Sequence, residues 1–161
     1  MRDNKIIRKR IALIGAGSMI EEYVKVLKSL GKVELAGIYS RTKKKTDKLI
    51  SQYQGLVFYN SIKKLYESTK ADLVIIAVSV ENTKKVCLEA SKYPWKCLVE
   101  KPFGYNFEEA RSLAKKFINK KQFYFGLNRN YYGTTQKIIE MLRNDKSKRV
   151  IYINDEQNIR N

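Results

Sequence analysis

Two glycines separated by one residue form a turn at which backbone could bind a ligand. Gly15 and Gly17 follow the short apolar run at residues 11–14, and an amphipathic stretch comes after them. In such a turn the first glycine permits a tight bend and the second lets backbone approach a pyrophosphate. The following helix start adds free N–H groups and a partial positive charge. The predicted phosphate-binding residues are Gly15, Ala16, Gly17, Ser18 and Met19.

The glycine pattern is incomplete at its third position. G-x-G-x-x-G places a small residue where helix and strand pack closely, and Ile20 stands there. A glycine pair is weak evidence for a phosphate-binding turn by itself. The prediction rests on its position at the first strand-to-helix junction. A plain turn without a ligand is the alternative.

The residues after the second apolar run suggest the identity of the dinucleotide. In NAD enzymes an acidic residue near this point accepts the ribose 2′-OH, but here the chain reads Tyr39-Ser40-Arg41-Thr42. Ser40, Arg41 and the nearby Lys43 suit a 2′-phosphate, the arginine by bidentate contact. We therefore predict NADP or NAD as cofactor, with NADP slightly favoured and Thr42 among the cofactor-binding residues. The alternative is that Arg41 is a solvated residue at a helix start.

A lysine at the end of the fifth apolar run is the predicted catalytic residue. Glu100-Lys101-Pro102 stands at the carboxyl end of the predicted strand at residues 96–100, at the edge where a parallel sheet binds its ligand. A partly desolvated lysine there can hydrogen-bond a substrate hydroxyl or carbonyl at the point of hydride transfer. The alternative is a structural strand end with a surface lysine.

The elements that must position these residues alternate along the chain. Apolar runs predict strands at residues 11–14, 33–39, 56–59, 73–78, 96–100 and 123–127, with a further strand at 149–154. Amphipathic stretches predict helices between them, among them one that ends at Gly31, one from Asn82 or Thr83 to Ala90, and one over residues 132–143. Repeated β-α-β units predict the α/β class, with a Rossmann-type doubly wound parallel sheet.

Apolar residues at helical spacing define the core face of the first predicted helix. Tyr23 or Val24, Leu27 and Leu30 recur at helical spacing and are predicted to face the sheet. Gly31 follows them and is well placed to end the helix.

The charge of the chain is strongly positive but dispersed. The 161 residues carry 33 Lys+Arg against 16 Asp+Glu, a formal net charge of +17. Such a field attracts nucleic acid and phosphorylated ligands. Because the lysines come in scattered pairs on predicted helices, without a zinc-finger or aromatic RNA-binding pattern, we predict a solvated surface and consider nucleic acid an unlikely partner.

The composition also limits the chemistry. The chain has no histidine, and Cys87 and Cys97 show no metal-ligand or redox spacing, so we predict no metal and two buried thiols. No apolar run is long enough for a membrane span, and the basic amino terminus lacks a signal-peptide pattern. These features predict a cytoplasmic protein without a membrane partner.

Five segments together resemble the glucose-fructose oxidoreductase / inositol dehydrogenase / MocA (Gfo/Idh/MocA) family of NAD(P)-dependent oxidoreductases. They are I-A-L-I-G-A-G-S-M, G-I-Y-S-R-T, A-D-L-V-I-I-A-V, L-V-E-K-P-F-G and F-G-L-N-R-N-Y-Y. The resemblance implies that Lys101 lies near the nicotinamide and substrate and takes part in catalysis. It also implies that Ser79, Asn82, Glu100 and Lys101 face the nicotinamide side of the cofactor, and Val78 is a further predicted cofactor-binding residue.

The resemblance further implies a second domain. Family members are about twice as long, and their second domain, an open antiparallel sheet, supplies much of the substrate site and often the oligomer interface. We therefore expect a nucleotide-binding domain over residues 1–128 and the beginning of a truncated α+β substrate or oligomerisation domain over residues 129–161. A fragment, a truncated gene product and half of a split enzyme all remain open, as do a homo-oligomer and a partner chain that supplies the missing domain.

The function predicted from these features is hydride transfer between nicotinamide and a hydroxyl or carbonyl of a sugar or sugar-derived substrate. The leading alternative is a non-catalytic dinucleotide-binding module or the remnant of a dehydrogenase. A nucleic-acid-binding protein is a third hypothesis, which rests on charge alone.

Overall fold

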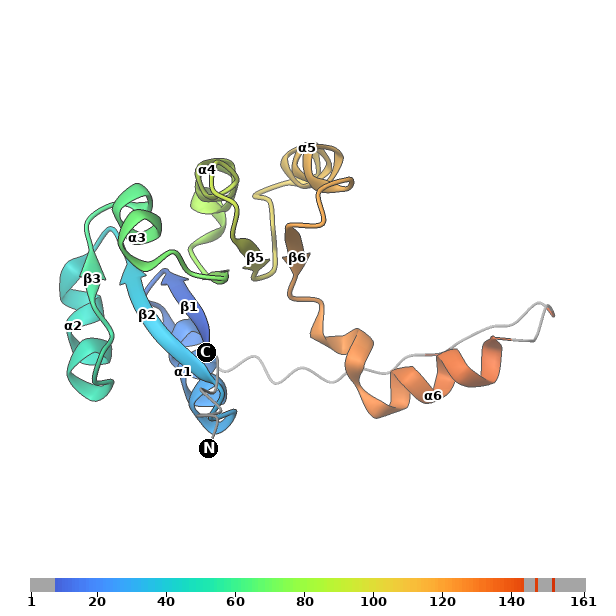
Figure 1. The fold of residues 1–161 in the computed structure, drawn as a ribbon. Coiled ribbons are helices and arrows are strands. Elements are labelled where there is room, and N and C mark those ends of the chain that lie inside the picture. Colours follow the sequence, from blue (N-terminus) through green and yellow to red (C-terminus); the bar gives the residue numbers. More distant parts are fainter. Residues whose placement is uncertain (1–7, 144–146, 148–151, 153–161) are drawn as a thin grey trace, which may run out of the picture. The chain divides into compact units, whose positions relative to one another are not determined.

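A computed structural model describes residues 8–143, 147 and 152 of the chain. Six parallel strands form one sheet in the order β3-β2-β1-β4-β5-β6 (Figure 1). The strands are β1 (Lys9–Ile14), β2 (Val33–Tyr39), β3 (Phe58–Tyr59), β4 (Leu73–Ile76), β5 (Lys96–Val99) and β6 (Phe123–Phe125). This strand order is that of the Rossmann fold, so the predicted fold class is confirmed.

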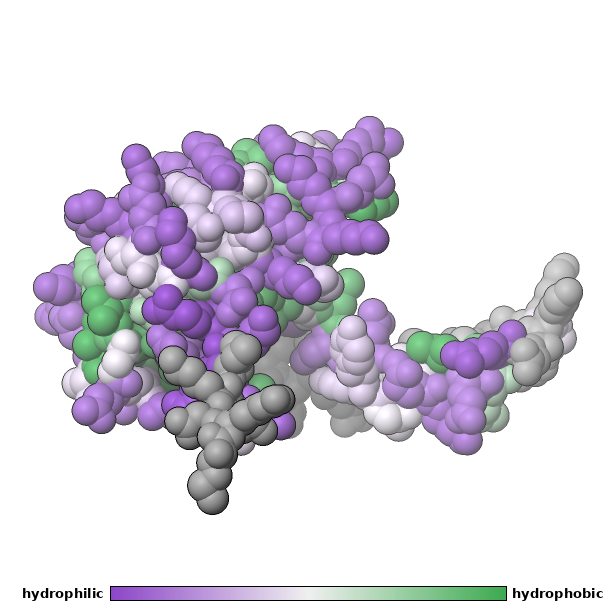
Figure 2. Space-filling model, in the orientation of Figure 1, coloured by the Kyte–Doolittle hydropathy of each residue, from purple (hydrophilic) through white to green (hydrophobic). Residues whose placement is uncertain are grey.

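Helices connect the strands and cover both faces of the sheet. The helices are α1 (Ser18–Ser29), α2 (Lys43–Gln52), α3 (Ile62–Thr69), α4 (Val80–Ala90) and α5 (Phe107–Phe117). Buried residues of α1 and α2 pack against one face, and those of α3, α4 and α5 pack against the other (Figure 1). Since each crossover connects parallel strands through a helix, both sheet faces are buried, which explains the nearly continuous apolar runs. Hydrophilic residues predominate on the outer surface of this unit that Figure 2 shows.

Alternation along β1 shows how one short strand serves two cores. Ile11 and Leu13 belong to the hydrophobic cluster with α1 and α2, whereas Ala12 and Ile14 belong to the cluster on the opposite face. Successive side chains of a strand point to opposite faces, so four apolar residues in a row anchor two helical layers.

The first helix differs from its predicted core face at one end. Ile20, Val24 and Leu27 are its buried residues, but Leu30 is 57% exposed. Leu30 occupies the C-cap position, beyond the last regular turn, and Gly31 then reverses the chain with φ +64°. The predicted helix end at Gly31 is confirmed, and the predicted burial of Leu30 is wrong.

The β4–α4 junction lies about two residues earlier in the chain than the sequence predicted. The strand ends at Ile76 instead of Val78, and α4 begins at Val80 instead of Asn82 or Thr83. The last ladder bond beyond the strand joins the Ala77 N–H to the Ile14 carbonyl at 2.9 Å. Val78 therefore leaves the sheet although it is apolar, which propensity alone does not reveal.

Two helix starts are fixed by side-chain caps. The Ser61 hydroxyl accepts a bond from the Lys64 N–H at 3.1 Å, and the Asn106 side chain accepts one from the Glu109 N–H at 2.9 Å. The Glu109 carboxylate accepts in return from the Tyr105 N–H at 3.1 Å. These bonds satisfy amides that have no partner within the helix.

Contacts between residues divide the chain after Leu127 into two units. In the second unit the structure describes a 3₁₀ turn at Asn128–Tyr131 and α6 (Gly133–Leu142), none of whose residues is buried. The strand predicted at residues 149–154 lies outside the described residues apart from Tyr152. The functional assignment of residues 129–161 remains a prediction. Among the described residues, no helix is long and apolar enough to span a bilayer.

Candidate dinucleotide-binding cleft

Strand register brings four chain segments to one edge of the sheet. Ile14 pairs with Tyr39 of β2 and with Ile76 of β4, and Ile76 pairs with Val99 of β5. The four strands therefore end level with one another. Their next residues enter the loops at the carboxyl edge, where β1 and β4 lead to helices on opposite faces.

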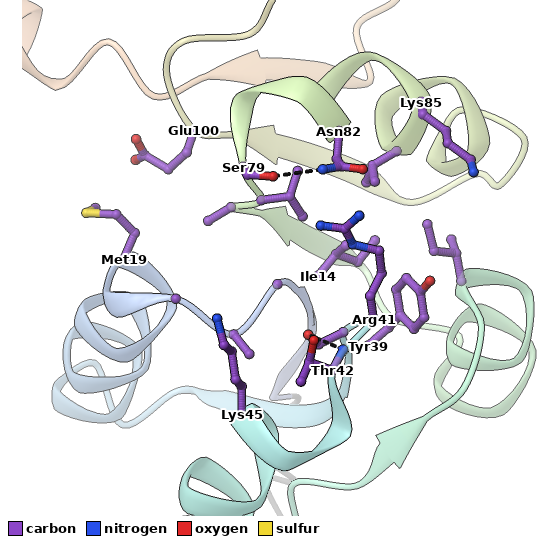
Figure 3. Close-up of a pocket in the computed structure, with 18 of the residues that line it drawn as sticks. Ile14, Met19, Tyr39, Arg41, Thr42, Lys45, Ser79, Asn82, Lys85 and Glu100 are labelled. Carbon is purple, nitrogen blue, oxygen red and sulfur yellow. Dashed lines mark hydrogen bonds between the residues drawn. The ribbon is translucent and has the colours of Figure 1, made fainter. Parts of the chain in front are cut away.

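A cleft of about 450 Å³ opens at this edge. It lies over the β1–β4 crossover, the place where doubly wound sheets bind their ligands (Figure 3). All the site residues predicted from the sequence line it: Gly15, Ala16, Gly17, Ser18, Met19, Ser40, Arg41, Thr42, Val78, Ser79, Asn82, Glu100 and Lys101. Their assigned roles toward a ligand remain predictions.

Gly15 is required by the protein itself. Its φ is +120°, and its N–H donates to the Tyr39 carbonyl at 2.8 Å. A Cβ at this position would lie 2.0 Å from the Ala77 carbonyl oxygen. Only glycine combines this backbone conformation with so close an approach between two strand ends.

Gly17 is not required by any contact among the described residues. It is the N-cap of α1 with φ −91°, which any residue can adopt, and a Cβ there would meet no atom within 4 Å. Without a side chain it supplies no side-chain cap to α1, although its carbonyl accepts the Ile20 N–H at 2.9 Å. The open space in front of a helix amino terminus suits an anionic group that approaches the backbone closely.

Ile20 shows how the departure at the third glycine position is accommodated. Its side chain is fully buried in the cluster of α1, and its Cγ1 would lie 3.5 Å from a Cβ on Gly15. The bulky residue therefore fills the gap under the turn and does not enter the cleft.

Arg41 marks one side of the cleft. It extends from the β2–α2 connection toward Asn82 on α4, and Lys45 and Lys85 also line the cleft (Figure 3). Lys43, which the sequence had suggested, is absent from the lining, and its Nζ lies 6.0 Å from the centroid of the Phe58 ring. Lys45 and Lys85 were missed because they stand in lysine clusters interpreted as solvated helix surface.

Glu100 marks the other side of the cleft. Its Oε1 accepts a hydrogen bond of 2.5 Å from the Tyr23 hydroxyl, and its Oε2 accepts one of 3.1 Å from the Lys101 N–H. Burial, together with the bond to this carboxylate, raises the pKa of Tyr23 well above its ordinary range. The sequence had suggested Tyr23 only as a core-facing residue, and nothing in its local pattern indicated a partner on β5.

Lys101 is exposed at this side of the cleft. Within the part of the chain that the structure describes, it forms no ion pair. Its ammonium is thus available to a ligand, as the predicted catalytic role requires.

The loop after β4 is organised by its own side chains. Asn82 donates from Nδ2 to the Ser79 hydroxyl at 2.7 Å, and Ser79 is the N-cap of α4. This bond holds both polar groups at the cleft wall (Figure 3).

The cysteines take no part in the cleft. Cys87 and Cys97 are buried and free, as predicted, and burial raises the pKa of each thiol to about 12. The described residues contain no group of His, Cys, Asp and Glu that could hold a metal ion.

Comparison with protein families identifies the family of the chain. A family profile described as an oxidoreductase family with an NAD-binding Rossmann fold, Gfo/Idh/MocA, matches residues 9–126. The chain belongs to the Gfo/Idh/MocA oxidoreductase family. Comparison with curated protein sequences finds no match.

Solved structures of dehydrogenases and other oxidoreductases share the fold at low sequence identity. Myo-inositol dehydrogenase from Lactobacillus casei, in complex with NAD(H) and myo-inositol, is 18% identical with a TM-score of 0.77, over 84% of this chain and 41% of its own. The WlbA dehydrogenase from Chromobacterium violaceum, in complex with NADH and UDP-GlcNAcA, is 20% identical with a TM-score of 0.72, over 85% and 40%. An oxidoreductase from Thermotoga maritima is 21% identical with a TM-score of 0.76, over 84% and 43%. The chain therefore spans about two fifths of the length of these proteins.

Proposed function

We propose that the cleft binds a nicotinamide dinucleotide and that the protein transfers hydride between it and a hydroxyl or carbonyl of a sugar-derived substrate. The observation that carries the proposal is Gly17 at the start of α1, where no described contact requires the missing side chain and a Cβ would enter open space. A diphosphate placed there would meet the first-turn N–H groups and the positive end of the helix. The bound cofactor would supply the site that accepts or donates hydride.

The cations beside the end of β2 support NADP as the preferred cofactor. The residues after β2 include no acid to accept a ribose 2′-OH, while Arg41 and Lys45 line the space beside them. A guanidinium can hold a phosphate through two parallel hydrogen bonds, and an ammonium adds a point charge. NADP would gain from these groups through its additional phosphate, which NAD lacks.

The opposite side supports hydride chemistry on a hydroxyl or carbonyl. Lys101 follows β5 at the cleft rim, where its ammonium can donate a hydrogen bond to a carbonyl or hydroxyl oxygen and take part in proton transfer. A sugar-type substrate is proposed by analogy with the solved relatives that hold myo-inositol and UDP-GlcNAcA. The catalytic role of Lys101 is therefore part of the proposed hydride transfer.

Titration with NADPH and NADH, followed by cofactor fluorescence, tests the proposal. We expect saturable binding of both, tighter for NADPH, and shifts in the amide NMR signals of residues 15–19. Equal or tighter binding of NADH would remove the NADP preference. Amide signals of the turn that stay unmoved at saturation would remove the cleft as the binding site.

A further inference from the structure

We propose that Tyr23 positions the Glu100 carboxylate as a fixed negative charge that favours the oxidised, cationic nicotinamide over the reduced, neutral one. The inference rests on the proposed dinucleotide function. It assigns a role to Tyr23, a residue of α1 that does not line the cleft, and a redox preference to the carboxylate beside Lys101.

Both oxygens of the carboxylate are held in place. Oε1 accepts from the Tyr23 hydroxyl at 2.5 Å and Oε2 from the Lys101 N–H at 3.1 Å. Gly126 closes the third side, since a Cβ there would lie 2.9 Å from Oε1. Three segments of the fold, α1, β5 and the end of β6, therefore define one orientation of this side chain.

The surroundings keep the charge unneutralised. Tyr23 remains a neutral hydrogen-bond donor, because burial and the neighbouring carboxylate raise its pKa. In the described part of the chain, no lysine or arginine forms an ion pair with Glu100. A carboxylate bonded only to neutral donors retains its full charge toward a ligand, and partial burial strengthens its field.

The position of Glu100 fits the nicotinamide end of the ligand. Glu100 and Met19 lie on one side of the cleft, and Arg41, Lys85 and Tyr39 lie on the other (Figure 3). A dinucleotide with its extra phosphate at Arg41 and its diphosphate at the glycine turn extends its second ring toward Glu100. The oxidised ring carries a positive charge that the reduced ring lacks, so a fixed carboxylate discriminates between them.

The ratio of dissociation constants for oxidised and reduced cofactor tests this inference. It is measured with the 161-residue chain for NADP⁺ against NADPH and for NAD⁺ against NADH. Glu100→Gln keeps the shape and removes the charge, so we expect the ratio to rise roughly tenfold, the scale of one partly screened charge pair. Tyr23→Phe keeps the charge but frees the carboxylate, and about a threefold rise is expected.

Gly126→Ala gives an independent test of positioning. Its new methyl group would lie 2.9 Å from Oε1 and would displace the end of the Glu100 side chain, so the ratio should rise as in Tyr23→Phe. Glu67→Gln on α3 and Tyr53→Phe after α2 are matched controls outside the cleft, for which we expect the wild-type ratio. Thermal unfolding verifies that each variant is folded.

The outcomes separate the two levels of the proposal. A wild-type chain that binds neither form of either cofactor overturns the proposed function and this inference with it. Binding with a wild-type ratio in Glu100→Gln overturns the role of the charge alone. A ratio that changes in Glu100→Gln but not in Tyr23→Phe or Gly126→Ala overturns the positioning role of Tyr23.

Discussion

A side-chain carbon on Gly15 would lie 2.0 Å from the carbonyl oxygen of Ala77. The two residues follow β1 and β4, the neighbouring strands whose helices leave to opposite faces of the sheet. The N–H of Ala77 also donates to the Ile14 carbonyl at 2.9 Å, so the two loops are fastened together below the cleft. The floor of the proposed cofactor site is thus part of the folded core.

Gly15→Ala is expected to destabilise the fold. The new methyl group meets backbone that cannot move without breaking the β1–β4 ladder, and φ +120° is strained for alanine. We expect the free energy of unfolding to fall by about 3 kcal/mol or more, measured by urea denaturation. A variant within about 0.5 kcal/mol of wild type would show that the turn can relax.

Gly17→Ala is expected to separate binding from stability. The alanine side chain enters open space and φ −91° suits it, so the free energy of unfolding should stay within about 1 kcal/mol of wild type. The same methyl group blocks close approach of a diphosphate, and we expect NADPH affinity to fall roughly tenfold or more. Fluorescence titration measures the affinity. Unchanged affinity in a folded variant would contradict the placement of the diphosphate.

Arg41→Ala is expected to reduce discrimination between the two cofactors. Loss of a bidentate phosphate contact should weaken NADPH binding roughly tenfold and leave NADH binding within about threefold. Arg111→Ala on α5 removes the same charge outside the cleft and is the matched control. Equal losses for both cofactors in Arg41→Ala would assign the arginine a role unrelated to the 2′-phosphate.

The buried thiols predict a loss of stability at alkaline pH. The pKa of Cys97 is raised by burial to about 12, against about 8.5 for an unfolded thiol. The folded state keeps its proton while the unfolded state loses it. The stabilisation is therefore complete below the unfolded pKa and is lost as pH rises toward the folded one.

Cys97→Ala isolates this contribution. Between about pH 8 and pH 10, we expect its free energy of unfolding to fall less steeply than that of wild type, by up to about 1.4 kcal/mol per pH unit. Urea denaturation across this range provides both slopes. Parallel curves would show that the thiol titrates alike in the folded and unfolded states.

Local sequence was sufficient for much of the fold. Residues 11–14 and 73–76 are short apolar runs between helical stretches, which indicates strands covered on both faces. Gly31 and Asn106 act at helix ends through their own backbone conformation or side chain. These signals lie within a few residues of their effect. The same reasoning failed at Val78, because contacts with neighbouring segments of the fold, and not local sequence, decide where β4 ends.

The cleft residues could also be predicted from their positions at the ends of parallel strands. Residues that follow parallel strands meet at one edge, so Gly15, Ser40 and Glu100 could be grouped before any contact was known. The remaining site residues could not be predicted, because they approach the cleft or Glu100 from distant parts of the chain. Tyr23 reaches a carboxylate 77 residues away, and Lys45 and Lys85 come to the same cleft from helices on opposite faces.

The sequence by itself determined the strand and helix alternation, the glycine turn and the lysine after β5, because periodicity and local backbone demands act over a few residues. Only the tertiary structure distinguished the two glycines. A Cβ on Gly15 would lie 2.0 Å from the Ala77 carbonyl oxygen, whereas a Cβ on Gly17 would meet no atom within 4 Å. The tertiary structure alone also joined Tyr23 to Glu100, since a hydrogen bond between α1 and β5 depends on how the helix packs on the sheet. No local pattern encodes that packing.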